Sequence, residues 1–127
     1  MNDVVLDASA IIAVINREPG AERVVPVADG AVVSSLIVAE VVTWLALRNI
    51  PEREIVATID ELNFRIEAFD QSRAMTAGLL VSKTKRRGLS LADRACLALA
   101  IELGLPAMTA DRAWRNLDIG VEIRLVR

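Results

Sequence analysis

Short apolar runs alternate with longer amphipathic segments along almost the whole chain. The runs occupy residues 4–6, 31–33, 65–69, 106–109 and 121–125, and each contains at least one β-branched residue. Runs of this length between turn residues are typical of strands. The segments between them carry apolar residues at helical spacing, which predicts that helices connect the strands.

Breaker and capping residues limit these expected helices. Pro19-Gly20 separates the first two, and Gly104 ends the last long one. Helices are expected over residues 8–14, 21–28, 35–49, 51–62, 71–87 and 90–103, with one further helical turn around Trp114. Strands that alternate with helices imply an α/β fold. We expect a single domain over residues 1–127 with a mostly parallel central sheet and helices on both faces.

The last long helix begins with a pattern that has two interpretations. Ser90 and Asp93 fit the first and last positions of a capping box. The apolar positions that follow, such as Ala95 and Leu99, would bury one face of the helix in the core. Asp93 would then lie at the rim of that core, at a helix N-terminus that favours negative charge. It could cap the helix or bind a cation.

Glu40 lies within the expected helix of residues 35–49 and shares a helical face with apolar residues. At about 100° per residue, its neighbours on that face are Val33, Leu36, Ile37, Trp44 and Leu47. A carboxylate buried among such residues is costly unless it has a partner. We therefore expect Glu40 to be bound to a metal ion or paired with an arginine such as Arg94.

Two further acids follow predicted strands. Asp7 comes directly after residues 4–6 and Asp111 just after residues 106–109, and each could simply cap the next helix. The carboxyl ends of parallel strands share one edge of a sheet, where functional sites form. We expect Asp7, Glu40, Asp93 and Asp111 to meet at this edge. They would repel one another unless a cation lay between them.

The chain contains no histidine, which excludes Ser-His-Asp and Cys-His catalysis and most zinc sites. Oxygen ligands alone favour Mg²⁺ or Mn²⁺, and such an ion suits hydrolysis of a phosphodiester. A polyanionic substrate would also need cations beside the acids. The candidates are Lys83, Lys85, Arg86, Arg87, Arg94 and Arg112. The cations of residues 83–87 could instead complement the dipole at a helix C-terminus.

Composition and net charge limit the class of protein and the compartment in which it is expected to act. Hydrophobic residues make up 54% of the chain and charged residues 25%, which is typical of a folded domain. The net charge of −2 means that any nucleic-acid binding must come from a local patch. Cys96 is the only cysteine and cannot form an internal disulfide, so we expect a reducing cytoplasm. We expect no export signal and no membrane span.

The order of these motifs resembles that of PIN-domain ribonucleases, and more narrowly that of the VapC toxins of bacterial toxin–antitoxin pairs. The motifs are Val5-Leu6-Asp7-Ala8-Ser9, Glu40 in an early helix, the stretch from Leu91 to Ala100 around Asp93, and Met108-Thr109-Ala110-Asp111. No single motif is specific, but their order and spacing span essentially the whole chain. The main departure is Trp114, where the family more often has phenylalanine.

The resemblance implies a PIN-like fold and a Mg²⁺-dependent endoribonuclease that cleaves RNA. It also implies a homodimer and inhibition by a VapB-like antitoxin. By motif match, Asp7, Glu40, Asp93 and Asp111 would form an acidic quartet, with Ser9 and Thr109 supporting it by hydrogen bonding. Separately, the apolar composition fits a surface groove that takes an antitoxin helix.

Two other functions are compatible with the same residues. A catalytically silent PIN-like binding module would use the acids only as helix caps or in salt bridges. A phosphotransfer receiver domain would accept phosphate on a strand-end aspartate. The only lysines, Lys83 and Lys85, lie in a predicted helix rather than after a late strand, which disfavours the receiver. Stabilisation by a metal ion would distinguish the nuclease from the silent module.

Overall fold

The computed structural model describes residues 3–127, and its elements follow the predicted alternation. The strands are β1 (Val5–Leu6), β2 (Val32–Ser34), β3 (Arg65–Glu67), β4 (Ala107–Thr109) and β5 (Ile123–Leu125). The α-helices are α1 (Ala8–Ile15), α2 (Ala21–Ala28), α3 (Ser35–Leu47), α4 (Glu52–Leu62), α5 (Gln71–Leu79), α6 (Val81–Thr84) and α7 (Leu91–Leu103). The 3-10 helices are η1 (Lys85–Arg87) and η2 (Arg112–Trp114). In this described range, no helix is long and apolar enough to cross a membrane.

The five strands form one sheet in the order β3-β2-β1-β4-β5, and every neighbouring pair is parallel. β1 is the central strand, because Val5 is in register with Val32 of β2 on one side and Ala107 of β4 on the other. The predicted parallel sheet is confirmed. Since all strands run the same way, their carboxyl ends lie at one edge.

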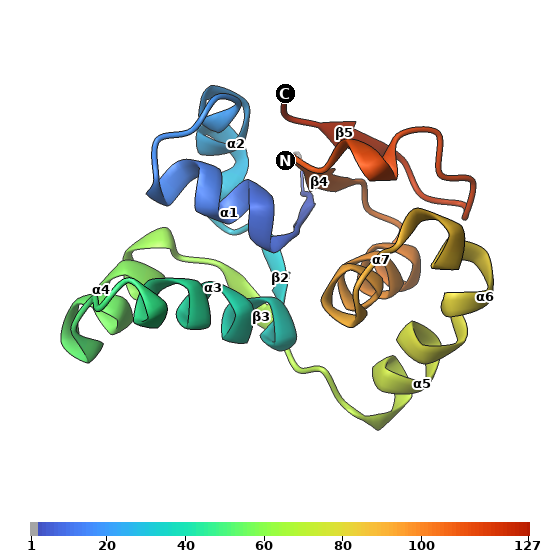
Figure 1. The fold of residues 1–127 in the computed structure, drawn as a ribbon, viewed down its shortest axis with the longest axis horizontal. Coiled ribbons are helices and arrows are strands. Elements are labelled where there is room, and N and C mark those ends of the chain that lie inside the picture. Colours follow the sequence, from blue (N-terminus) through green and yellow to red (C-terminus); the bar gives the residue numbers. More distant parts are fainter. Residues whose placement is uncertain (1–2) are drawn as a thin grey trace.

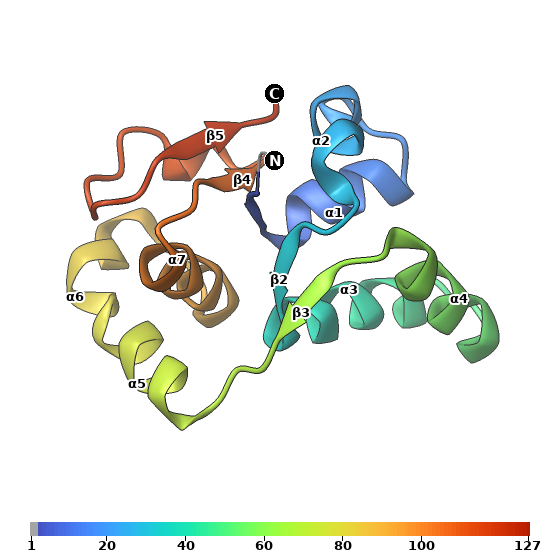
Figure 2. The ribbon, with the colours of Figure 1, turned by 180° about the vertical axis from the view of Figure 1, so that it is seen from behind.

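Helices cover both faces of this sheet, as predicted. Figures 1 and 2 show α1 to α4 on one side and α5 to α7 on the other. α7 packs against β1, β2 and β4, whereas α1 contacts β4 and α3 contacts β2. The central strand is fully enclosed, and Val4, Val5 and Leu6 are each 0% exposed.

α7 is the most deeply buried helix. All its residues from Ala95 to Ala100 are buried, and it contacts α3 and α5 as well as the sheet. Small alanine side chains allow this close approach on several sides. Cys96 is a free cysteine, as expected, and it is buried. Gly104 ends the helix with a φ of 65°, a left-handed conformation that favours glycine.

One predicted helix is divided in the structure. Residues 71–87 form α5, the short α6 and η1 rather than a single helix, and the first break falls at Leu80. Arg94 of α7 donates hydrogen bonds to the carbonyl oxygens of Ala77 (3.0 Å) and Gly78 (3.3 Å) just before this break. A side chain that takes helical carbonyl groups beside a glycine weakens the helix there. The break therefore depends on a tertiary contact.

Candidate functional site

Asp7 connects β1 to α1 at the carboxyl edge of the sheet. It is the N-cap of α1, and its Oδ1 accepts a hydrogen bond from the amide of Ala10 (2.8 Å). Only 2% of its surface is exposed. Aspartate is seldom buried this deeply without a partner. Asp7 caps α1 directly after the central strand, and this position places its carboxylate inside the fold.

Two hydroxyl groups from different elements donate to the Asp7 carboxylate. Ser9 Oγ lies 2.8 and 2.9 Å from its two oxygens, and Thr109 at the end of β4 donates to Oδ2. Backbone amides in turn donate to both hydroxyls: Ala110 N–H to Ser9 Oγ and Asp111 N–H to Thr109 Oγ1, each at 2.9 Å. The hydroxyl protons are thereby directed toward Asp7.

The charge on Asp7 is destabilised by its surroundings. Burial raises the pKa of Asp7 from 3.8 to about 6, because it removes water from the charged form. The hydrogen bonds from Thr109, Ala10 and Ser9 lower the pKa and partly oppose this effect. The negative charge of Asp93 raises the pKa again. A cation bound at Asp7 would relieve both the burial and the repulsion.

Asp93 lies in the first turn of α7, where the predicted capping box is present. Its Oδ2 accepts from the amide of Ser90 (2.8 Å), and its own amide donates to Ser90 Oγ (3.1 Å). The structural interpretation of this motif is therefore confirmed. The cap also orients the carboxylate, whose charge acts on both Asp7 and Glu40.

Glu40 lies on an open flank of α3, so the prediction that its apolar neighbours bury it is wrong. The residue is exposed, and within residues 3–127 it forms no salt bridge with Arg94 or any other cation. The buried face of α3 is made by Ile37, Val41 and Leu45. Glu40 is displaced from that face along the helix surface. Of its apolar neighbours, Val33 and Ile37 are buried in the core, whereas Leu36, Trp44 and Leu47 line an open surface.

Those apolar residues line a groove between α1 and α3. The groove has a volume of about 430 Å³ and is lined by Ala8, Ile12, Leu36, Ala39, Glu40, Thr43, Trp44 and Leu47. Leu47 is 76% exposed, so this apolar stripe is surface rather than core. Partial burial and the charge of Asp93 raise the pKa of Glu40. Glu40 therefore lies within the field of the acids at the sheet edge.

Asp111 begins η2 as its N-cap, and its Oδ1 accepts from the amide of Ala113 (2.9 Å). The residue is exposed. Its connection to the other acids runs through the backbone, because its amide donates to Thr109, which donates to Asp7. The structure thus brings Asp7, Asp93 and Glu40 into one electrostatic field and places Asp111 at the end of the neighbouring strand.

No basic side chain of residues 3–127 neutralises these acids. None of the four takes part in a salt bridge within the described chain. No group of three His, Cys, Asp or Glu side chains in residues 3–127 is close enough to hold a metal ion together. Mg²⁺ needs fewer protein ligands than that, because it keeps several waters and binds through one or two carboxylates. Asp7 and Asp93, which supply only oxygen and lack a cation, fit such an ion.

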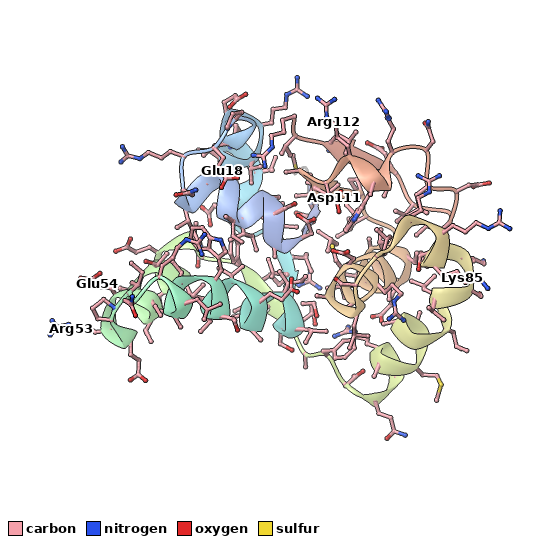
Figure 3. All side chains as sticks on the ribbon, in the orientation of Figure 1. Glu18, Arg53, Glu54, Lys85, Asp111 and Arg112 are labelled. Carbon is pink, nitrogen blue, oxygen red and sulfur yellow. The ribbon has the colours of Figure 1, made fainter. Side chains whose placement is uncertain are left out.

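The basic residues predicted to meet a polyanion divide into two groups. Arg94 and Arg87 are used within the fold: Arg94 bonds to α5, and Arg87 bonds to backbone carbonyl groups of residues 113–116. Arg87 is nevertheless exposed, and so are Lys83, Lys85, Arg86 and Arg112. Figure 3 shows Lys85 and Arg112 pointing outward from the molecule.

Two contributions to the site were not anticipated from the sequence. The backbone amides of Ala110 and Asp111 orient the hydroxyls of Ser9 and Thr109, and no side-chain pattern encodes that role. Arg115 is exposed directly after η2 and adds a further cation. The available signal was its position, three residues after Arg112.

Comparison with known proteins places the fold. The sequence matches the PIN domain family over residues 4–120. The chain is similar in structure to a DNA-bound VapBC from Salmonella typhimurium, with a TM-score of 0.76, 19% identity and 100% of each chain covered. It is also similar to VapC20 from Mycobacterium tuberculosis, a sarcin-ricin loop cleaving toxin, with a TM-score of 0.72, 19% identity and coverage of 94% of this chain and 99% of that chain. FitAcB from Neisseria gonorrhoeae has a TM-score of 0.68 and 24% identity, with 97% of each chain covered. A search of curated proteins found no significant match.

Proposed function

Because this chain belongs to the PIN domain family, we propose that it is an endoribonuclease that hydrolyses phosphodiester bonds of RNA with Mg²⁺ as its cofactor. The observation that carries this proposal is the buried Asp7 carboxylate, which is destabilised by burial and by Asp93 and forms no salt bridge with any cation of residues 3–127. A purely structural cap gains nothing from a like charge nearby. A cation-binding site, in contrast, gains from a second negative charge, because both charges attract the ion.

Asp7 and Asp93 are the proposed direct ligands of the ion, and Glu40 and Asp111 complete the acidic site. Mn²⁺ could replace Mg²⁺, since both prefer oxygen ligands. When bound, the ion polarises a phosphoryl oxygen and lowers the pKa of water. That chemistry suits attack on a phosphodiester.

The protein's own residues prepare the site. Ser9 and Thr109 hold Asp7 at both carboxylate oxygens, so its orientation does not depend on solvent. The capping box holds Asp93. Glu40 is exposed to substrate and water, and its raised pKa favours proton exchange nearer to neutral pH.

We also propose that the chain is the toxin of a toxin–antitoxin pair, acts in the cytoplasm and forms a homodimer. Its structural neighbours include a toxin–antitoxin complex from Klebsiella pneumoniae, the VapBC from Salmonella typhimurium and the toxin VapC20. A VapB-like antitoxin is the proposed inhibitor. VapC20 is described as cleaving the sarcin-ricin loop, which supports RNA as the substrate class.

Two apolar grooves on α3 suit such an antitoxin. Besides the groove of about 430 Å³ next to α1, a groove of about 540 Å³ lies between α3 and α4. The second is lined by Val38, Val42, Ala46, Ile50, Glu52, Ile55, Val56, Ile59 and Asp60. Open apolar grooves accept the apolar face of an amphipathic helix. Because the first groove includes Glu40, a segment bound there would also cover part of the acidic site.

Cleavage of a mixed RNA pool tests the nuclease. The purified protein should produce discrete fragments with Mg²⁺ and none with excess chelator. Asp93→Asn keeps an oxygen for the Ser90 amide but removes the charge, so it should fold normally and lose cleavage. Asp70 is the N-cap of α5 and, like Asp7, accepts from the amide three residues later, that of Arg73 (2.9 Å), so Asp70→Asn is the matched control that should stay active. Cleavage retained by both Asp7→Asn and Asp93→Asn would contradict the proposal.

A second candidate function is a catalytically silent binding module. It is favoured by one observation: Asp7, Asp93 and Asp111 each serve in the capping of a helix. In such a module Mg²⁺ would leave the melting temperature unchanged, because an ion that does not bind cannot stabilise the native state. Folded protein that cleaves no RNA and shows no response to Mg²⁺ would favour this alternative.

A further inference from the structure

Two segments that are distant in sequence and rich in cations lie side by side, because Arg87 of the first bonds to the backbone of the second. The first segment is residues 83–87, and the second is residues 112–115. Together they carry six of the 15 Lys and Arg residues: Lys83, Lys85, Arg86, Arg87, Arg112 and Arg115. Within the described chain none of the six forms a salt bridge, although four other arginines do. The chain as a whole has a net charge of −2, so this excess is local.

Arg87 holds the two segments together. Its guanidinium donates to the carbonyl oxygens of Ala113 (3.1 Å), Arg115 and Asn116 (3.3 Å). A planar guanidinium with five donors can bridge several carbonyl groups at once, which the single ammonium group of lysine does less well. Arg87 therefore fixes η2 against η1, and its own N–H groups are used in hydrogen bonds within the protein.

η2 connects this surface to the acidic site. Asp111 caps η2, and its amide donates to Thr109, which donates to Asp7. Arg112 is the next residue along the chain. A ligand held by the cations of η2 therefore lies next to the carboxyl edge of the sheet, where the acids are.

We propose that Lys85, Arg86, Arg112 and Arg115 form a phosphate-binding face for RNA, called here the basic face, and that Arg87 is the positioning residue that assembles it. The inference rests on the proposed function and assigns the path of its substrate, along η1 and η2 toward the acids. An acidic site repels a polyanion, so the substrate must be held by cations beside it. Contacts to phosphate position a nucleic acid without reading its bases.

Binding can be measured separately from cleavage. Asp93→Asn protein without divalent ions is titrated with fluorescent single-stranded RNA at several salt concentrations. Each lost phosphate contact should reduce the slope of log K against log salt by about 0.7. Lys85→Ala combined with Arg86→Ala should reduce it by about 1.4, and Arg112→Ala by about 0.7. Arg53→Ala is the matched control, because Arg53 is an exposed arginine of α4 on the opposite side of the molecule from Lys85 (Figure 3).

Variants of Arg87 test its positioning role. Arg87→Gln should reduce the slope by more than the amount expected for one phosphate contact. Without the guanidinium, η2 is no longer fixed against η1, and Arg112 and Arg115 move with it. Arg112→Ala should then have less effect in the Arg87→Gln background than in the parent, since the two residues act through the same segment. Arg87→Lys should restore binding only in part. In cleavage assays with active protein, these variants should raise KM and leave kcat nearly unchanged.

The outcomes separate the two proposals. Unchanged slopes in the Lys85, Arg86 and Arg112 variants would overturn the proposal of the basic face even if the protein cleaves RNA. The proposal would also be overturned if these residues bound an acidic protein instead of RNA. Full rescue by Arg87→Lys would show that Arg87 acts as a simple charge and would overturn its positioning role. The expected slopes in a protein that cleaves nothing would support the basic face and contradict the nuclease.

Discussion

Asp7 combines two requirements that usually fall on different residues. As an N-cap it must accept from the amide of Ala10, and as a residue that follows the central strand it must be buried. The hydroxyls of Ser9 and Thr109 reduce the resulting cost but leave the pKa raised to about 6. The protein therefore holds a carboxylate that is less stable in its charged form than an ordinary surface aspartate.

Asp7→Asn should make the metal-free protein more stable at neutral pH while abolishing RNA cleavage. The pKa of Asp7 is about 6 in the native state against an ordinary value of 3.8, so the native state binds more protons between these two pH values. The free energy of unfolding of the wild type should therefore fall as pH rises from about 4 to about 6, and stay low above that. Asparagine carries no charge and should recover up to about 3 kcal/mol at neutral pH.

Urea denaturation in excess chelator, across this pH range, measures the difference. Asp70→Asn, which changes an exposed cap, should show no such gain. A lower stability of Asp7→Asn at neutral pH would mean that the hydrogen bonds of Ser9 and Thr109 outweigh the cost of burial. The description of Asp7 as a destabilised charge would then be wrong.

At the scale of elements, strand–helix junctions build the site. Asp7, Ser34 and Asp111 each follow or end a strand and cap the next helix, because short polar side chains there satisfy free amides. A parallel sheet gathers these junctions at one edge. The N-terminus of α7 brings Asp93 to the same place from the other face of the sheet.

The junction between α1 and α2 is also held by the end of the chain. Gly20 has a φ of 100°, and a Cβ there would lie 2.6 Å from the carbonyl oxygen of Val126. Gly20→Ala should therefore destabilise the protein by about 2 to 5 kcal/mol, from backbone strain and the clash together. Gly30 has a φ of 77° but open space around it, so Gly30→Ala should lose only about 1 to 2 kcal/mol. Equal losses in urea denaturation would mean that Val126 does not restrain this junction.

At the scale of the whole molecule, the structure has three surfaces with different chemistry. The acids come from strand ends (Asp7 and Asp111) and from helices (Asp93 and Glu40), the basic face lies on η1 and η2, and the apolar grooves lie on both flanks of α3. Glu40 belongs to the acidic site and to one groove. A partner bound in the groove that contains Glu40 would therefore cover part of the proposed acidic site, which suits an enzyme that a partner protein inhibits.

Mg²⁺ should raise the melting temperature of the wild type by several degrees. A ligand that binds only the native state stabilises it by about 2.7 kcal/mol when its concentration is about 100 times its dissociation constant. The shift should be absent in Asp7→Asn and present in Asp70→Asn. Thermal unfolding with Mg²⁺ and with excess chelator provides the comparison. An equal shift in wild type and Asp7→Asn would place the ion away from Asp7.

Much of the fold was determined by local sequence. Periodicity and capping residues predicted every strand of the sheet and most helices, because both depend on residues within one or two turns of each other. The capping box of Ser90 and Asp93 and the caps at Asp7 and Asp111 are present for the same reason. The strand-end positions of Asp7 and Asp111 then followed from the alternation of strands and helices.

Only the tertiary structure decided what faces each side chain. The apolar neighbours of Glu40 predicted burial, yet nothing in residues 3–127 covers that flank of α3, and periodicity cannot distinguish a core face from an open groove. The predicted helix of residues 71–87 breaks where Arg94 bonds to it, and Arg87 bonds to η2 rather than facing solvent alone. The hydrogen-bond partners that determine these features are separated by 16 or more residues in the sequence. The sequence pattern does not reveal them, because packing free energy depends on surfaces that meet only after the chain has folded.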